Sequence, residues 1–126
     1  MFRVFERLLG LFGFQGMEKQ FNSLADTNTL DELIVRSNNE PVILFKHSTT
    51  CPVSSAAYRE MSKVADEVML VVIQKSRDVS NEIAKRTGIR HESPQTLILR
   101  NGEVVWSASH FDITADGVTR AARENA

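Results

Sequence analysis

The sequence contains a single cysteine, Cys51, among its 126 residues. A lone cysteine excludes an internal disulfide and favours a reducing compartment, so we expect a cytoplasmic protein. Any disulfide that Cys51 forms must join the chain to another molecule. The histidines show no paired spacing with the cysteine that would indicate zinc. We therefore expect no bound metal and no tightly bound cofactor.

The sequence also lacks a strong charge of either sign and a long hydrophobic run. Its 15 Lys and Arg nearly balance its 16 Asp and Glu, and a formal charge of -1 gives no electrostatic basis for binding nucleic acid. The apolar stretch from Leu8 to Phe14 is too short to span a bilayer. A hydrophobic content of 42% over 126 residues indicates one soluble domain with a single core.

The first sixteen residues differ from the remainder because their apolar side chains recur at helical spacing: Phe2, Phe5, Leu8, Leu9 and Phe12. Three interpretations are open. The segment is an extra helix packed on the domain, a weak contact with a membrane or partner, or a misassigned start with Met17 as the initiator. Membrane contact is the least favoured. We therefore divide the chain into an amphipathic extension, residues 1–16, and a domain, residues 17–126.

Cys51 sits where a predicted strand gives way to a predicted helix. The run Val42–Phe45 is apolar throughout and reads as a buried strand, whereas from Val53 onward apolar residues recur at helical spacing. Pro52 suits the first helical position, where its fixed φ is favourable and its missing N–H costs nothing. Cys51 is thus the predicted N-cap, with the N–H groups of Val53 and Ser54 aimed at its sulfur.

This placement predicts a reactive thiol. The thiolate is the form that attacks disulfides, and free N–H groups with the helix dipole stabilise a negative sulfur. Ser54 can donate its hydroxyl to the same sulfur, and His47 would favour the thiolate if protonated. Thr50 offers a contact to a bound thiol, whereas Lys46 is interpreted as a solvated strand end. The alternative is a buried, inert cysteine.

The remaining segments predict an alternating order of strands and helices. Thr29 to Glu32 has capping-box spacing and predicts a helix, after a short strand near Phe21 and Leu24. The apolar run over 68–73 predicts a buried strand, and a helix follows from Asp78 and stops at Gly88. Strands are predicted over 96–99 and 104–106, joined by the turn Asn101-Gly102. Thr114 caps a last helix. The helix after Cys51 connects the strand over 42–45 to the strand over 68–73, so these two strands are predicted to be parallel.

The resulting order, β-α-β-α-β-β-α, places the chain in the α/β class with a central mixed sheet. Together with the cysteine at the first strand–helix junction, the segment from Ser93 to Glu103 resembles the thioredoxin fold. In that family the proline matching Pro94 is cis and lies beside the active cysteine. The backbone of the preceding residue, here Ser93, pairs with the bound thiol or peptide.

A closer resemblance is carried by two motifs, His47-Ser48-Thr49-Thr50-Cys51-Pro52-Val53-Ser54 and His91-Glu92-Ser93-Pro94. These resemble the monothiol bacilliredoxin family, bacterial proteins with a Thr-Cys-Pro-x-Ser active site. The resemblance implies a cytoplasmic protein of the bacillithiol redox system. Such a protein takes bacillithiol from mixed disulfides on S-thiolated proteins and is regenerated by a second thiol or a partner thiol–disulfide reductase.

The candidate site therefore has three parts. Cys51 is the predicted catalytic residue. Pro52, Val53, Ser54 and His47 are the predicted thiolate-stabilising residues. Thr50, Ser93 and Pro94 are the predicted residues that bind the substrate thiol. His91 and Glu92 either meet charged groups of a small thiol or belong to an exposed loop.

The residue at position 54 predicts how the thiol would work. Enzymes that reduce a substrate disulfide use a second cysteine, three residues on, to resolve the mixed disulfide. Ser54 cannot do this, so an external thiol must complete the cycle, and bacillithiol as its identity comes from the resemblance alone. Two alternatives remain: a non-catalytic thioredoxin-like binding or redox-sensing module, and, less favoured, an iron–sulfur carrier similar to monothiol glutaredoxins, whose Cys-Gly-Phe-Ser is Cys-Pro-Val-Ser here.

Overall fold

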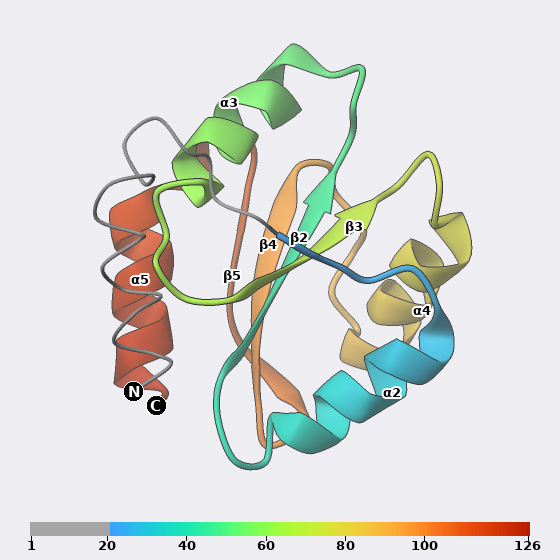
Figure 1. The fold of residues 1–126 in the computed structure, drawn as a ribbon, viewed down its shortest axis with the longest axis vertical. Helices are drawn as coiled ribbons and strands as arrows, with labels where there is room; N and C mark the ends of the chain where they lie inside the picture. Colours follow the sequence, from blue (N-terminus) through green and yellow to red (C-terminus); the bar gives the residue numbers. More distant parts are fainter. Residues whose placement is uncertain (1–20) are drawn as a thin grey trace, which may run out of the picture.

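The computed structural model describes residues 21–126, in which helices cover both faces of a five-stranded sheet (Figure 1). The strands are β1 (Asn22–Ser23), β2 (Val42–His47), β3 (Val68–Val72), β4 (Gln95–Arg100) and β5 (Glu103–Ser109). The helices are α2 (Thr27–Arg36), α3 (Pro52–Met61), α4 (Arg77–Thr87), the 3-10 turn η1 (His110–Asp112) and α5 (Ala115–Glu124). The extension 1–16 lies outside the described residues, so its interpretations stay predictions.

The strand order in the sheet is β1-β3-β2-β4-β5. β3 pairs in parallel with β1 and with β2, whereas β4 pairs antiparallel with both β2 and β5, so the sheet is mixed as predicted. The β4–β5 turn uses Asn101 and Gly102 at φ 56° and 78°. Positive φ at both central residues matches the right-handed twist of the strands, which is why Asn-Gly predicts a hairpin.

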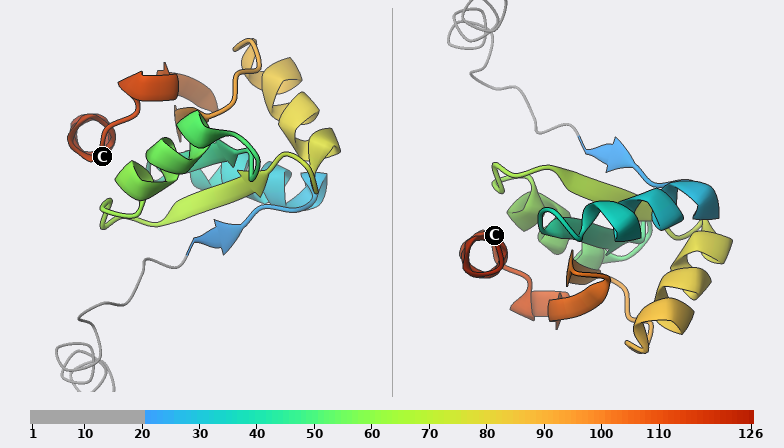
Figure 2. Two further views of the ribbon diagram at one scale, coloured as in Figure 1. Left: turned by 90° about the horizontal axis from the view of Figure 1, so that it is seen from above. Right: turned by 90° about the horizontal axis from the view of Figure 1, so that it is seen from below.

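Alternation along β2 divides the core into two layers. Val42 and Leu44 face α2 and α4, whereas Ile43 and Phe45 face α3 and α5. The two views of Figure 2 show the helix pairs on opposite sides of the sheet. Burying one Leu or Phe side chain contributes about 1.5–3 kcal/mol to folding, so the apolar run Val42–Phe45 stabilises both layers of the core.

The predicted helix ends at Thr114 and Gly88 are observed, whereas the start of the first helix differs from the prediction. Thr114 caps α5 by accepting from Gly117 N at 3.1 Å, and Gly88 ends α4 in the left-handed conformation. The first helix, however, begins earlier than the capping box at Thr29 predicts. Asp26 is its N-cap and accepts from Thr29 N at 2.7 Å. A carboxylate suits this position because its charge complements the helix dipole.

The topology brings several chain segments to one edge of the sheet. The carboxyl ends of the parallel strands β2 and β3 meet there, and Ile73 N donates to His47 O at 3.0 Å. Because β4 is antiparallel to β2, its first residues reach the same edge, as do the starts of α3 and α4. Cys51 and Pro94 therefore share this edge. No helix within residues 21–126 is long and apolar enough to cross a membrane.

Candidate active site

Cys51 is the N-cap of α3, as predicted, with Pro52 in the first helical position. Its thiol is free and half-buried. The predicted hydrogen bonds from the N–H groups of Val53 and Ser54 to the sulfur are not formed, because the Cys51 side chain accepts no capping bond. The sulfur keeps its position at the positive end of the helix dipole but remains available to a substrate.

Ser54 has a different partner from the one that the sequence suggests. Its hydroxyl is completely buried, accepts from Ser48 N at 2.9 Å and lies 2.9 Å from His47 Nδ1. Side chains in the first helical turn point back toward the N-terminus, which here means the end of β2. Ser54 thus joins α3 to the loop in front of Cys51, and its predicted donation to the thiolate is replaced by this bond.

The surroundings of His47 favour its neutral form. Its ring is buried against Tyr58, with ring centroids 4.9 Å apart, and burial lowers the pKa of His47 against an opposing effect of the bond with Ser54. The Ser54 oxygen thus lies between Ser48 N and His47 Nδ1 and joins the ring to the loop. The lowered pKa of His47 disfavours the protonated form in which it would favour the thiolate.

Gln74 holds the loop that leads into Cys51, and no local pattern in the sequence predicts this role. Its amide nitrogen donates to Ser48 Oγ at 2.7 Å and to Thr50 Oγ1 at 3.4 Å, and its amide oxygen accepts from Thr49 N at 3.3 Å. One side chain thus contacts three consecutive residues. The sequence does contain one non-local signal for this role. Gln74 directly follows the predicted strand over 68–73, and that strand ends at the same edge of the sheet as β2.

The second predicted segment faces the same edge. The Ser93–Pro94 bond is cis, as the thioredoxin resemblance implies, and Pro94 is buried. Pro94 O accepts from His110 N at 3.1 Å. The Ser93 hydroxyl is buried with no hydrogen-bond partner among residues 21–126. Glu92 pairs with His110 across 3.3 Å, which joins this segment to the turn after β5.

The burial of Lys46 differs from the sequence-based expectation of a solvated side chain. We interpreted Lys46 as a solvated strand end, yet its side chain is completely buried on the α4 face of β2. The ammonium donates to Ser80 O and lies 3.2 Å from both that oxygen and His91 Nδ1. Burial lowers the pKa of Lys46 to about 8. The sequence could not show this, because burial at a strand end depends on which helix packs over it.

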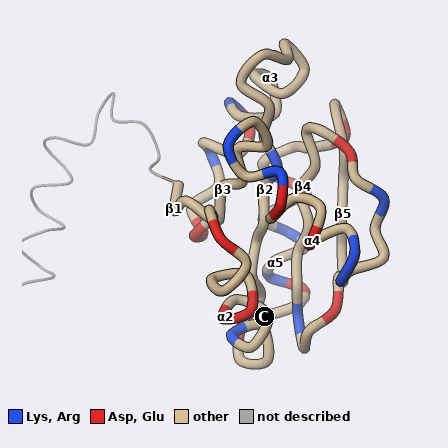
Figure 3. Tube along the Cα trace, turned by 90° about the vertical axis from the view of Figure 1, so that its right-hand side faces the viewer, with Lys and Arg blue, Asp and Glu red and all other residues tan. Residues whose placement is uncertain are grey.

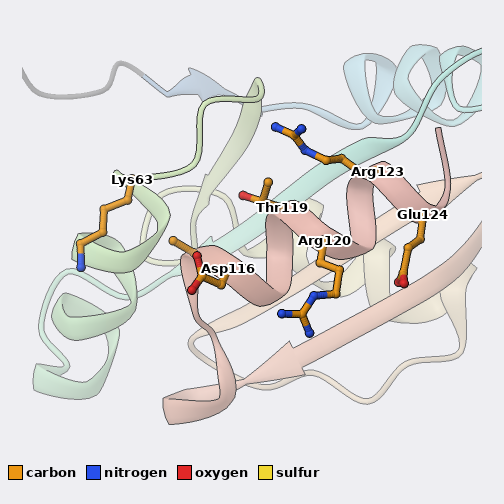
Figure 4. Close-up of a pocket in the computed structure, with 7 residues that line it drawn as sticks. Lys63, Asp116, Thr119, Arg120, Arg123 and Glu124 are labelled. Carbon is orange, nitrogen blue, oxygen red and sulfur yellow. The ribbon is translucent and has the colours of Figure 1, made fainter.

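Other surface features lie apart from Cys51. A hollow of about 600 Å³ runs along α5, with Lys63, Thr119 and Arg123 among its lining residues (Figure 4), and it includes neither Cys51 nor Pro94. Basic and acidic residues are interspersed along the chain (Figure 3). Within residues 21–126, no three His, Cys, Asp or Glu side chains gather where a metal ion could bind.

Solved structures with this arrangement identify the fold. One, described as a candidate oxidoreductase with a thioredoxin fold, is 35% identical, with a TM-score of 0.73 over 86% of this chain and 96% of its own. Thioredoxin from Fasciola hepatica is 12% identical, with a TM-score of 0.66 over 84% of this chain and 100% of its own. A thioredoxin variant from Halobacterium salinarum is 14% identical, with a TM-score of 0.63 over 84% and 90%.

A thioredoxin-type sheet with a cysteine at the start of the helix between β2 and β3, and a cis proline at the same edge, defines a thiol–disulfide oxidoreductase. Residues 22–118 match the family described as monothiol bacilliredoxin BrxC. The chain belongs to the monothiol bacilliredoxin family. The match includes both motifs that carry the resemblance in the sequence.

Proposed function

We propose that this protein is a monothiol exchange enzyme that takes bacillithiol, or a similar low-molecular-weight thiol, from mixed disulfides on cytoplasmic proteins. The observation that carries the proposal is the bonding of Ser54. The position that holds a resolving cysteine in dithiol enzymes has a buried hydroxyl fixed between His47 and Ser48 N. No second thiol exists in the chain to release a substrate from Cys51.

The exchange proceeds by thiolate attack and conserves the number of disulfides. The Cys51 thiolate attacks the small-thiol sulfur of a protein mixed disulfide, and a bond forms between that sulfur and Cys51. The original disulfide breaks, and the released protein thiolate takes a proton from water. An external thiol or a thiol–disulfide reductase then attacks the Cys51 mixed disulfide and restores the free thiol.

Several neighbours support this use of Cys51. The thiol lies at the positive end of α3, where the helix dipole favours the thiolate. Gln74 fixes the hydroxyl of Thr50, which we assign to contact with the bound thiol. Ser93, whose backbone we assign to pairing with the substrate, sits beside Pro94 in a segment joined to the turn at His110.

Intact mass measurement tests the proposal. The reduced protein is incubated with a bacillithiol-modified carrier protein, beside a Cys51→Ser control. We expect the wild type alone to gain the mass of one bacillithiol while the carrier is released as a free thiol. Release of the carrier without any adduct on Cys51 would contradict the mechanism. An absence of transfer, with Cys51 also resistant to iodoacetamide, would favour the non-catalytic binding module instead.

A further inference from the structure

Lys46 is a buried cation that forms no ion pair with an acidic residue among residues 21–126. Its side chain has no exposed surface, and its ammonium contacts Ser80 O and His91 Nδ1, each at 3.2 Å. None of the ion pairs formed within residues 21–126 includes Lys46. Burying an unpaired charge is costly, and such groups are usually paired or neutralised. A role in the site would explain why a lysine occupies this position.

The contacts of Lys46 determine the tautomer of His91. Lysine has only donors, so the His91 nitrogen that faces it must accept. The Ser80 hydroxyl lies 3.1 Å from the same Nδ1. The ring proton is therefore on Nε2. Burial lowers the pKa of His91, and the charge of Lys46 lowers it further, so both favour the neutral ring.

His91 lies three residues before Pro94 and, among residues 21–126, contacts the interior through Nδ1 alone. The residue is exposed overall, although Nδ1 faces the interior. Its two chain neighbours are held by Gln95, whose side chain donates to Arg90 O at 2.9 Å and accepts from Glu92 N at 3.4 Å. The backbone on either side of His91 is thereby fixed, at the edge of the sheet that also carries Cys51.

The charges that act on His91 favour an anion nearby. Lys46 and Arg77 both exert a positive field on the ring, opposed by Glu92. Glu92 also faces His110, with which it pairs at 3.3 Å. An Nε2–H donor polarised from behind by an ammonium is a good partner for a carboxylate, because hydrogen bonds to charged groups are the strong ones.

We propose that His91 is a specificity-determining residue that donates from Nε2 to a carboxylate of the small thiol, and that Lys46 is the positioning residue that fixes this tautomer. The inference rests on the proposed function, since it concerns the thiol that Cys51 receives. It assigns recognition of a carboxylate on that thiol to His91. It also explains the buried ammonium of Lys46, which fixes the tautomer of the residue that recognises the thiol.

Two isosteric small thiols test the preference. One carrier protein with a single cysteine is modified with 3-mercaptopropionate, which is anionic, or with 3-mercaptopropionamide, which is neutral. The kcat/KM for transfer to Cys51 is measured for each and divided by the rate of its uncatalysed exchange with 2-mercaptoethanol. We expect the wild type to prefer the anionic substrate by about tenfold, the effect of one charge-assisted hydrogen bond.

Variants assign the preference to the two residues. His91→Leu and Lys46→Met are each expected to reduce the preference for the anionic substrate to about twofold or less. His91→Gln, which keeps a donor near the Nε2 position, is expected to retain most of it. Equal rates for the two substrates in the wild type, or a full preference in His91→Leu, would overturn the inference. Failure of transfer from both substrates would instead contradict the proposed function.

A second readout does not depend on turnover. Nitrogen-15 NMR of the imidazole rings distinguishes the two neutral tautomers, and the His91 signals are assigned by their loss in His91→Gln. We expect the wild type to show the Nε2–H tautomer and Lys46→Met to show a mixture of both. Protonation of Nδ1 in the wild type would contradict the role of Lys46.

Discussion

The hydroxyl of Ser54 lies 2.9 Å from Nδ1 of His47, deep beneath the first turn of α3. The same oxygen accepts from Ser48 N at 2.9 Å. These bonds tie the start of the helix to the end of β2 and so fix the backbone on both sides of Cys51. Ser54 contributes to the site as a support of its geometry and leaves the sulfur exposed to substrate.

Ser54→Ala tests this support. Removing the hydroxyl leaves a buried N–H at Ser48 without a partner, so we expect the free energy of unfolding to fall by about 1–3 kcal/mol. Urea denaturation measures the change. Ser55→Ala is the matched control, since the Ser55 hydroxyl reaches only Cys51 O at 3.4 Å. Equal stability of the two variants would contradict the role given to Ser54.

Lys46→Met tests the cost of the buried cation through pH. The pKa of Lys46 is 10.5 in the unfolded chain and about 8 when folded. Below about pH 8 both states are charged and folding carries the full penalty, whereas above about pH 10.5 both are neutral and the penalty vanishes. The variant should therefore gain up to ~3 kcal/mol near pH 7 and lose most of that advantage near pH 10. Urea denaturation of both proteins at these two pH values checks it; a difference independent of pH would be contrary to a charged, buried Lys46.

Gln74→Ala tests the positioning of the loop before Cys51. Losing the contacts to Ser48, Thr49 and Thr50 frees the loop, so we expect kcat for transfer to fall about tenfold. The free energy of unfolding should change by less than ~1 kcal/mol, because Gln74 is exposed. Lys75→Ala, at the neighbouring exposed position, should retain wild-type kcat. Equal kcat in both variants would show that the loop needs no support from Gln74.

Phe111→Ala tests a contact with protein substrates. Phe111 is 74% exposed and follows His110, which binds Pro94 O. An exposed aromatic side chain beside the site provides apolar surface for a partner protein. We expect KM for a thiolated protein to rise about fivefold, with stability within about 0.5 kcal/mol of the wild type. Val35→Ala, 65% exposed on α2, is the control and should leave KM unchanged. A small disulfide substrate should show no difference between Phe111→Ala and wild type, and a rise in its KM would contradict a protein-docking role.

Local signals were sufficient for much of the fold. Apolar runs predict β2 and β3, Asn101-Gly102 predicts the β4–β5 turn, and Thr114 and Gly88 predict helix ends. These features depend on residues close in the chain, where periodicity and backbone conformation act directly. The first helix begins earlier than the capping-box spacing at Thr29 predicts. Asp26, with its charged carboxylate, is the N-cap.

The sequence by itself determined the chemistry of this protein: one cysteine, its place as the N-cap of α3, and the absence of a resolving thiol at position 54. Only the tertiary structure decided which polar groups meet. Gln74 reaches the Thr50 loop, Ser54 bonds His47, and Lys46 lies buried beneath His91. The physical reason is that side-chain hydrogen bonds and burial join segments far apart in the chain. Their partners depend on strand register and helix packing, which no local pattern records.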